Sequence, residues 1–420
     1  MKWLRRNVWR LLALAASVAL ALGFVPENHP ELSALLTRFS PILSLFGAAA
    51  VRAWLGWTLL LGIPLLILPL FKGRLFCWRI CPMGFLAELA GKLNPKGKGV
   101  IRHVPMLNKA LALIVAATAA AGYPLLIWLD PLCIFNGFFA AWRTPFTVAA
   151  LATGIGFAVL LVMSVIAPNI WCHRICPLGG LQEILMLLAR HLAEGRKPET
   201  PKSGDLPPAS LPHSAAVSRR ILLTAIPAAA AGVVAGKVFG PYGRKALRPP
   251  GADLEKINAL CARRGNCMRV CPYQLIQPDL GDSGIDGLFT PVVWLRSRNP
   301  DQEQYCFQDC VKCTQVCPTG ALRPLTVRQK HDAAIGIAEI DRKKCVAWEN
   351  KEYCAVCDEY CPYKAIKLEK RGDVMCPVVD LSKCRGCGAC ESACPADPIA
   401  ITVKPLRGVT LLPRRDGGKS

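Results

Sequence analysis

The distribution of hydrophobic residues divides the chain into two parts. Long apolar runs fill the first 240 residues, whereas the rest alternates short apolar and polar segments. A helix that spans a bilayer needs roughly 20 mainly apolar residues, so the runs predict a membrane α-helical domain with four to five transmembrane helices. A shorter apolar piece at 38–47 predicts a re-entrant or interfacial helix. The predicted spans are 8–25, 54–71, 111–128, about 147–170, and a fifth at 221–239.

Composition and charge support the same division. A hydrophobic share of 52% beside a charged share of 19% is too apolar for a purely soluble chain of this length. Lys and Arg exceed Asp and Glu by 22, and 15 of these excess charges lie in residues 1–240 beside the apolar runs. Basic flanks of this kind follow the positive-inside rule and predict a cytoplasmic N-terminus. They therefore do not indicate a nucleic-acid partner.

A duplicated cysteine motif follows the second and fourth apolar runs. Cys77/Cys81 and Cys172/Cys176 both read C-x3-C-P, and the two copies lie 95 residues apart. Residues four apart share one face of a helix, so each pair presents two sulfurs together, and the following proline is expected to end that turn. Four thiols at the cytoplasmic rim of the membrane predict a cluster, a metal site or a redox dithiol pair. Inert or palmitoylated cysteines are the alternative.

Four further cysteine groups, each ending in Cys-Pro, hold fifteen of the 21 cysteines. The last group reads C-x2-C-x2-C-x3-C-P, the bacterial ferredoxin spacing in which three thiolates hold one [4Fe-4S] cluster and the fourth reaches another. Neither a disulfide framework nor a zinc site repeats this pattern. The predicted cluster ligands are Cys261, Cys267, Cys271, Cys306, Cys310, Cys313, Cys317, Cys345, Cys354, Cys357, Cys361, Cys384, Cys387, Cys390 and Cys394.

The first of these groups lacks its second cysteine, where Arg264 stands. A guanidinium has no lone pair for iron, so the sequence predicts three complete [4Fe-4S] sites and one incomplete or [3Fe-4S] site. Cys376 is either a ligand lent to that site or a buried free thiol, and Cys133 is predicted to be a packing residue. The spacing leaves open whether neighbouring groups exchange their fourth cysteines, or whether the first group exchanges with the fourth and the second with the third.

The order of these features along the chain predicts domains that lie in different compartments. Arg219 and Arg220 precede a mildly apolar segment, which is typical of twin-arginine export or of a fifth transmembrane helix. Both interpretations place the following domain in the periplasm of a bacterium, with the first part as a multi-pass domain of the inner membrane, and a cytoplasmic cluster domain is the alternative. The predicted parts are a membrane domain at 1–190, a linker at 191–217, the twin-arginine segment at 218–240, a small α+β poly-[4Fe-4S] ferredoxin-like domain at 241–405 and a tail at 406–420.

Other cofactor motifs are missing from the sequence. No G-x-G-x-x-G follows a predicted strand, and no C-x-x-C-H occurs. A nicotinamide or flavin domain and a c-type haem are therefore unsupported. The chain is predicted to relay electrons without hydride chemistry.

The motifs resemble two known families. Residues 1–190, with Cys77/Cys81 and Cys172/Cys176, resemble NapH, MauN and the membrane part of NosR. Residues 218–405 resemble the NapG and MauM ferredoxins in the twin arginine, in Leu-Arg-Pro-Pro-Gly-Ala from Leu247, and in Cys-Pro-Thr-Gly-Ala-Leu from Cys317. The chain looks like a fusion of the two partners. It departs from them at Arg264 and in lacking the cytoplasmic ferredoxin that follows the spans of NapH.

The resemblance implies a quinol dehydrogenase-type electron-transfer subunit. We expect a membrane-anchored polyferredoxin that takes electrons from membrane quinol and passes them through [4Fe-4S] clusters to a periplasmic reductase or a cytochrome c. The alternative is an accessory protein that supplies electrons for the maturation of a periplasmic metalloenzyme, and a structural metal-binding scaffold is a third, weaker interpretation. The sequence assigns no catalytic residue.

Overall fold

The computed structural model describes residues 2–22, 35–52, 57–72, 74–94, 107–141, 148–194, 214–239, 246–295 and 305–406. The chain forms two compact units. Unit 1 comprises Met1–Val238, Ala259–Arg264 and Pro318–Gly320, and unit 2 comprises Phe239–Asn258, Gly265–Cys317 and Ala321–Ser420. Most of the predicted linker and nearly all of the predicted tail lie outside the described residues. The predicted domain boundaries remain predictions.

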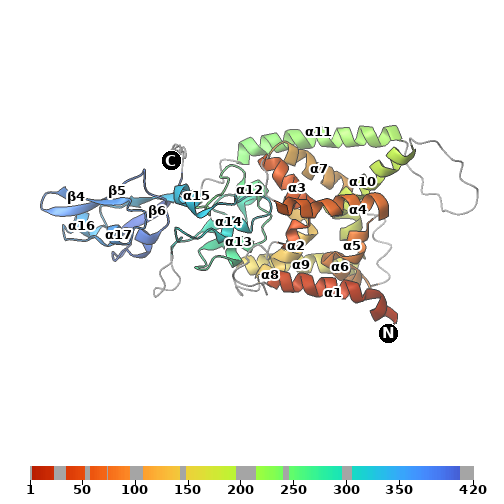
Figure 1. The fold of residues 1–420 in the computed structure, drawn as a ribbon, viewed down its shortest axis with the longest axis horizontal. Helices are drawn as coiled ribbons and strands as arrows, with labels where there is room; N and C mark the ends of the chain where they lie inside the picture. The colour runs from red at the N-terminus through yellow and green to blue at the C-terminus, as the bar shows by residue number, and fades with distance from the viewer. Residues whose placement is uncertain are drawn as a thin grey trace, which may run out of the picture. The chain divides into compact units, whose positions relative to one another are not determined.

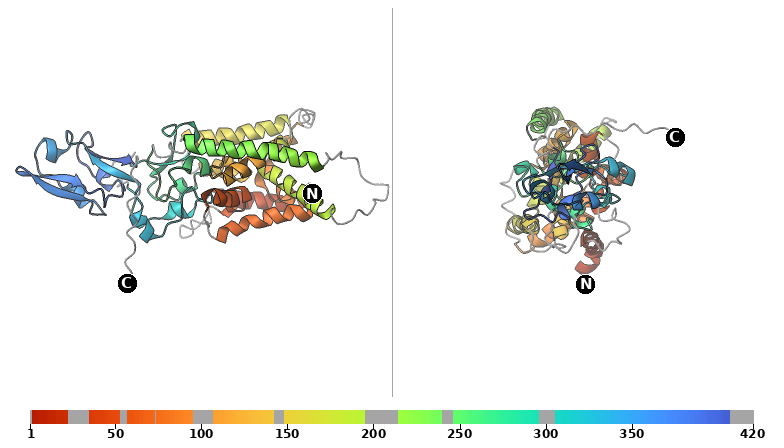
Figure 2. Two further views of the ribbon diagram at one scale, coloured as in Figure 1. Left: turned by 90° about the horizontal axis from the view of Figure 1, so that it is seen from above. Right: turned by 90° about the vertical axis from the view of Figure 1, so that its left-hand side faces the viewer.

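Unit 1 is helical, and its helices are drawn from red to green in Figure 1. The long helix α11 runs along the outside of this unit, where Gly232 faces Thr118 of α7 (Figures 1 and 2). The elements are α1 (Lys2–Leu22), α2 (Leu35–Arg38), α3 (Pro41–Val51), η2 (Trp57–Gly62), α4 (Ile63–Lys72), α5 (Leu75–Arg79), α6 (Pro82–Gly91), α7 (Asn108–Ala120), η4 (Ile127–Leu129), α8 (Pro131–Ala141), α9 (Val148–Ile166), η5 (Trp171–Ile175), α10 (Pro177–Glu194) and α11 (Ser214–Phe239).

The duplicated motif has the same backbone in both copies. The amide of Cys81 donates to the carbonyl of Phe76 at 2.8 Å, and the amide of Cys176 donates to that of Trp171 at 2.7 Å. Both bonds span five residues, as in a π-helical turn, which is frequent at functional sites. The proline after each pair starts the next helix, because proline suits the first helical position. The prediction that this proline ends the turn is thus correct, and it also begins α6 and α10.

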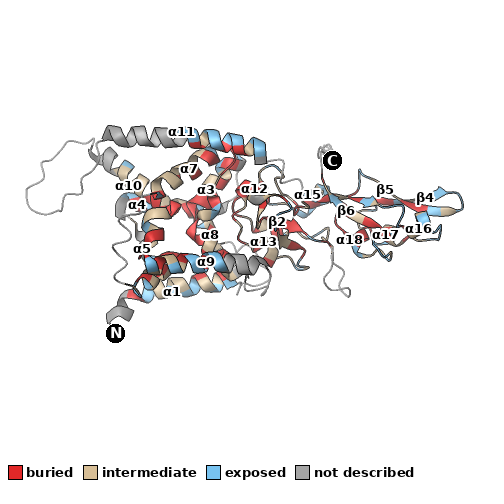
Figure 3. Ribbon diagram, turned by 180° about the vertical axis from the view of Figure 1, so that it is seen from behind, coloured by how far each residue is buried: buried red, intermediate tan, exposed pale blue. Residues whose placement is uncertain are grey.

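The two copies pack crosswise. Helix α6, which follows the first motif, packs on α9, which precedes the second motif. Helix α10, which follows the second motif, packs in turn on α4, which precedes the first. This exchange brings the two cysteine pairs into one core, where Met83 and Leu178 are fully buried and Phe138 stacks on Phe157 with ring centroids 4.3 Å apart. In Figure 3 the buried residues of unit 1 lie on the inner faces of its helices.

The prediction of a membrane-spanning domain is wrong. Among the described residues, no helix combines the length and the apolar character that a bilayer crossing requires. The second predicted span is divided between η2 and the ten-residue α4, and the third ends at Ala120, after which Gly122 turns the chain with φ +91°. Helices α1 and α11 contain basic residues, and the side chains of the first seven residues of α9 lie outside the described part.

Unit 2 consists of short helices and three two-stranded antiparallel sheets. β1 pairs with β2, β4 pairs with β5 as a hairpin, and β3 pairs with β6 over the register Gly336↔Pro405 to Ile340↔Ile401. The elements are α12 (Ile257–Leu260), α13 (Asn266–Arg269), β1 (Ile276–Pro278), η7 (Ile285–Gly287), β2 (Pro291–Val293), α14 (Lys312–Gln315), α15 (Val327–Asp332), β3 (Gly336–Ile340), α16 (Val346–Glu349), α17 (Val356–Glu359), β4 (Ile366–Arg371), β5 (Val374–Val379), α18 (Ala389–Ser392) and β6 (Ile401–Pro405).

Within unit 2, strands frame the last two cysteine groups. The third group lies between β3 and β4, and the fourth lies between β5 and β6, so two similar halves are joined by the β4–β5 hairpin (Figure 1). The pairing of β3 with β6 closes the two halves on each other. This approach requires glycine, because a Cβ on Gly386, which has φ +62°, would lie 2.4 Å from the backbone of Gly336. The small α+β cluster domain is therefore present.

Candidate functional site

The third and fourth cysteine groups exchange their last members. Cys345, Cys354 and Cys357 line one space together with Cys394 of the fourth group, and we call this set site A. Cys384, Cys387 and Cys390 line a second space together with Cys361 of the third group, and we call this set site B. The structure thus has the exchange between neighbouring groups, which is one of the two alternatives that the spacing leaves open.

A third set of thiols lies beside them in unit 2. Burial has the largest effect on the pKa of Cys313 and raises it, and the nearby thiols of Cys306, Cys310 and Cys271 raise it further. Cys306 likewise raises the pKa of Cys271, after burial. Three members of the second group therefore gather with the last cysteine of the first group, as site C: Cys271, Cys306, Cys310 and Cys313.

Sites B and C adjoin each other. The backbone amide of Cys306 in site C donates to the carbonyl of Cys387 in site B at 2.9 Å. The Tyr363 ring lines site B, and burial and then the thiols of Cys387 and Cys306 raise the pKa of its hydroxyl. Since A and B exchange cysteines and B bonds to C, the three sites form a row in the order A, B, C.

The residues of these sites fit an iron–sulfur cluster. Each set provides four sulfur donors, and the linings of sites A and B are mainly apolar, which favours soft, multinuclear iron over a hard cation. Backbone amides also point at sulfur, from Ala365 to Cys361 at 3.3 Å and from Ala338 to Cys384 at 3.5 Å. Among the described residues, no three His, Cys, Asp or Glu side chains gather closely enough to hold a single metal ion.

The three other predicted ligands are Cys261, Cys267 and Cys317. Cys261 belongs to unit 1 and Cys267 to unit 2, and Cys317 in unit 2 accepts a hydrogen bond from the amide of Leu322 at 3.3 Å. The incomplete first site remains a prediction. Cys376 on β5 is buried beside the thiols of site A, and its Sγ donates to the carbonyl of Ala347 at 3.4 Å.

In unit 1 the four thiols of the duplicated motif gather in the core. Burial, and after it the nearby thiol of Cys172, raise the pKa of Cys77 to about 12. Burial also raises the pKa values of Cys81 and Cys176, and both respond to the thiols of Cys77 and Cys172. Since the thiolate is the reactive form in disulfide exchange, these shifts disfavour a redox dithiol pair at neutral pH. Metal coordination would instead deprotonate the thiols.

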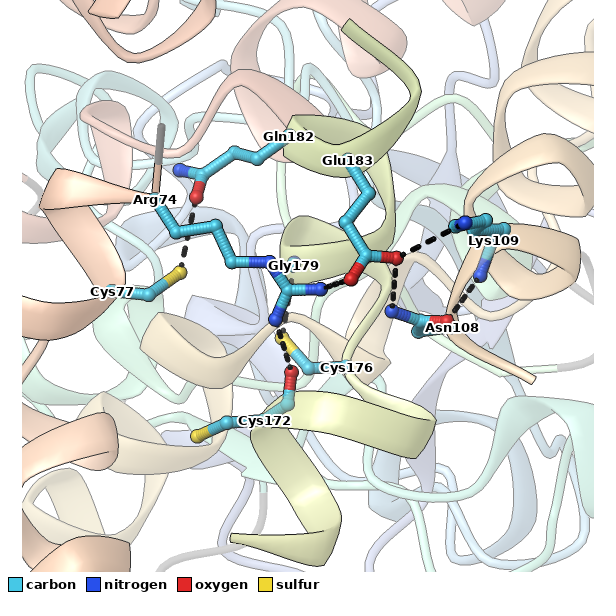
Figure 4. A network of polar contacts seen from close by, with 9 residues as sticks. All are labelled: Arg74, Cys77, Asn108, Lys109, Cys172, Cys176, Gly179, Gln182 and Glu183. Atoms are coloured by element: carbon cyan, nitrogen blue, oxygen red, sulfur yellow. Dashed lines mark hydrogen bonds and ion pairs between the residues drawn. The ribbon is translucent and has the colours of Figure 1, made fainter. Parts of the chain in front are cut away.

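Polar side chains lie near three of these cysteines, Cys77, Cys172 and Cys176 (Figure 4). The Sγ of Cys77 donates to the amide oxygen of Gln182 at 3.2 Å, while the Nε2 of the buried Gln182 has no hydrogen-bond partner among the residues that the structure describes. Arg74 donates to the carbonyl of Cys172 at 3.3 Å and forms an ion pair with Glu183, which also accepts from Asn108. The guanidinium of Arg74 and the side-chain amide of Gln182 therefore lie near Cys172 and Cys77, where negative charge would develop if these thiols lost their protons.

Glycine is required seven residues after the first cysteine of each pair. A Cβ on Gly84 would lie 2.6 Å from the carbonyl oxygen of Cys77, and a Cβ on Gly179 would lie 2.9 Å from that of Cys172. We expect Gly84→Ala to displace the Cys77 turn and to lower stability by about 1–3 kcal/mol, the usual cost of overpacking. Gly156→Ala is the matched control, because nothing lies within 4 Å of its Cβ and alanine favours a helix. Equal thermal stabilities of the two variants would contradict this expectation.

A buried carboxyl in unit 1 is expected to make stability depend on pH. Asp130 is fully buried and accepts hydrogen bonds from Ser40 and from the amides of Leu132 and Cys133. Burial raises its pKa from 3.8 to about 6, against the opposing hydrogen bonds and the charge of Arg264. The folded state thus keeps its proton until about pH 6, whereas the unfolded chain loses it near pH 4, so stability falls as the pH rises through this window.

We therefore expect the stability of the wild type, relative to Asp130→Asn, to fall by about 1 kcal/mol between pH 5 and pH 7. The asparagine side chain cannot ionise, so the stability of Asp130→Asn should lack this pH-dependent contribution. Thermal unfolding of both proteins at the two pH values measures the difference. Parallel pH profiles would show that Asp130 does not titrate in this range.

Three polar partners of the thiols could not be identified from the sequence. Lys330 lies 24 residues from Cys306 along the chain, yet its Nζ donates to the Sγ of that cysteine at 3.1 Å. Gln182 reaches Cys77 from more than one hundred residues away, and Arg74 reaches the second motif from the first. Only the charge of Arg74 beside an apolar run could have attracted attention.

Family models and curated proteins both match the chain. Two models described as "4Fe-4S binding domain" match, one over residues 53–100 and 149–193 and the other over 377–400. Similar proteins include the methylamine utilization ferredoxin-type proteins MauM of Methylorubrum extorquens, with 35% identity over 45% of this chain and 89% of the relative, and of Methylobacillus flagellatus, with 32% identity over 44% and 83%.

The ferredoxin-type protein NapG of Escherichia coli is 34% identical over 38% of this chain and 71% of its own length. No solved structure is detectably similar. The first of the two matched models covers both C-x3-C-P motifs, and the second covers the fourth cysteine group.

Proposed function

Because the chain belongs to the family of MauM and NapG ferredoxin-type proteins, we propose that it transfers electrons from a quinol to a periplasmic acceptor through three [4Fe-4S] clusters. It is a ferredoxin-type electron-transfer protein with 4Fe-4S domains. The quinol, the acceptor and the number of clusters are the new parts of the proposal. The acceptor is a reductase or a cytochrome c.

The observation that carries the proposal is the row of sites A, B and C in unit 2. Cys394 and Cys361 are exchanged between A and B, and the amide of Cys306 bonds to the carbonyl of Cys387 between C and B. A bound [4Fe-4S] cluster takes up and releases one electron at a time. Thiols and apolar side chains such as Ile340 and Ile401 hold such groups close together and away from water.

Residues 1–190 are proposed as the counterpart of the NapH and MauN partners, fused to the ferredoxin part. The match of a 4Fe-4S model over both C-x3-C-P motifs and the gathering of their four thiols support this proposal. A quinol donor fits this arrangement, because a two-electron donor must deliver its electrons singly to such sites. The fusion would place donor-side and acceptor-side parts in one chain.

The test is anaerobic reduction of the purified full chain by a quinol analogue such as duroquinol, followed by absorbance and EPR. We expect partial reduction of clusters that dithionite reduces fully, with about twelve irons per chain at sites A to C. Reduction by dithionite without any reduction by the quinol would remove the quinol from the proposal. Iron-free protein would remove the electron-transfer role of these sites.

The periplasmic location is proposed from the twin arginine that lies within α11. A C-terminal reporter that is active only in the periplasm should be active in the wild type. It should lose most of its activity when Arg219 and Arg220 are both changed to Lys, if export depends on this pair. An inactive reporter in the wild type, with the fusion protein present in the cells, would contradict the proposed location.

A further inference from the structure

A buried lysine lies directly at site C. Lys330 is on α15, which begins with a capping box formed by Thr326 and Gln329. Its side chain is only 1% exposed, and its Nζ donates to the Sγ of Cys306 at 3.1 Å. Among the described residues, this sulfur is the one hydrogen-bond acceptor of Nζ. The ammonium group of Lys330 therefore makes its hydrogen bond to a sulfur of site C.

Burying a lysine without an anion is costly, and buried lysines are normally paired with one. No carboxylate forms an ion pair with Lys330 in the described part of the chain: Asp309 pairs with the exposed His331 at 3.1 Å, and Asp332, on the same helix, is exposed. The partner is the sulfur of Cys306, which is anionic only as a thiolate. A thiolate at this position is what a cluster ligand provides, so the buried cation fits an occupied site C.

Within the described ranges of the chain, no lysine or arginine side chain donates to a sulfur of the neighbouring site B. The cation in its lining is Arg385, which is half-buried and donates to the carbonyl oxygens of His331, Ser382 and Cys384 rather than to sulfur. Its charge is closer to solvent and therefore more strongly screened than that of Lys330. Sites B and C thus differ in the charge that acts on their sulfurs.

We propose that Lys330 is a redox-tuning residue that raises the reduction potential of site C above that of site B. Reduction adds one negative charge to the cluster and its thiolates, and a buried cation in contact with one of those sulfurs stabilises the added charge. This inference rests on the proposed function and adds the direction in which electrons move between sites B and C. Electrons shared between sites B and C would therefore settle at site C.

The test is an EPR-monitored redox titration of the anaerobic full-length protein. The variant is Lys330→Met, which removes the charge and the N–H donors while keeping a long side chain. Lys312→Met is the matched control, because Lys312 lies on α14 next to Cys313 but is exposed. Cys310→Ala identifies the signal of site C by its loss. Lys330→Gln, which keeps an N–H donor without the charge, is the second variant if the methionine protein binds less iron.

We expect the one-electron equilibrium of site C to shift toward the oxidised form at least tenfold in Lys330→Met, which corresponds to 59 mV. Lys312→Met should shift it much less, and the other signals should hardly move. An unchanged potential in both Lys330 variants, or an equal shift in Lys312→Met, would overturn the tuning role. A wild type without iron–sulfur signals would instead overturn the proposed function, so the two failures are distinguishable.

Discussion

Replacing Cys357 with alanine is expected to remove about four iron atoms per chain and one EPR signal. Cys357 is one of the four sulfurs of site A, and its thiol lies beside those of Cys345, Cys354 and Cys394. A cluster that loses one of four thiolates loses a large part of its binding energy, and metal binding is coupled to folding in such small domains. Iron analysis and EPR of anaerobically purified protein measure the loss.

The matched control for this experiment is Cys376→Ala. Cys376 is also buried and packs beside the same thiols, but its Sγ donates to the carbonyl of Ala347. Alanine there removes a thiol of the same size from the same region, so iron should be retained at the wild-type level. Equal iron in Cys357→Ala and the wild type would refute site A, and an equal loss in Cys376→Ala would make Cys376 a ligand.

Arg248→Ala is expected to lower the stability of unit 2 by about 3–5 kcal/mol, the usual cost of breaking a buried ion pair. The Arg248 side chain is 1% exposed, and its guanidinium lies 3.6 Å from the fully buried Asp279. It also donates to Asn258 at 3.0 Å and to Ser283 at 2.7 Å. Alanine would leave a buried carboxylate without its cation, which is why the expected cost is large.

Thermal unfolding should show a decrease in Tm of roughly 10 °C for Arg248→Ala, given the size of unit 2. Arg323→Ala is the control, because Arg323 forms an ion pair with Asp253 at 3.2 Å while its side chain remains 61% exposed. An exposed pair of this kind contributes at most about 1 kcal/mol. Similar decreases in Tm for the two variants would show that the burial of Arg248 does not explain its contribution to stability.

Hydropathy predicted the helical character of the first half but not the extent of its helices. The run at 54–71 is apolar throughout, yet it divides into a 3-10 segment and the short α4, which contains Pro69. The run at 111–128 contains Gly122 and ends its helix at Ala120. An apolar average does not report where a helix stops, because single Gly and Pro residues and packing partners decide that.

The two strand-like pieces of the cluster domain were easier to recognise. The short apolar pieces at 335–340 and 399–403 are strand-like in sequence, and the structure has β3 (Gly336–Ile340) and β6 (Ile401–Pro405) at these places. Their pairing was not predictable, because it joins residues about sixty positions apart. Pairing requires Gly336 and Gly386 to approach each other, a constraint that neither glycine reveals alone.

The identity of the cluster ligands, which are cysteine sulfurs, could be predicted from the sequence alone. Cysteine spacing within one short loop is a local property, so the number, type and grouping of the sulfurs could be predicted directly from the chain. The departure at Arg264 is equally local, since a guanidinium cannot ligate iron wherever it lies.

The fold, in contrast, was needed to show which sulfurs share a site and which charged side chains contact them. The exchange of Cys361 with Cys394, the bond from Cys306 to Cys387 and the contact of Lys330 with Cys306 all join residues that are distant in sequence. Such contacts depend on how strands and helices pack, and packing depends on the whole set of side chains in a unit. For that reason the ligands were predictable from the chain, whereas their order and relative potentials depend on the fold.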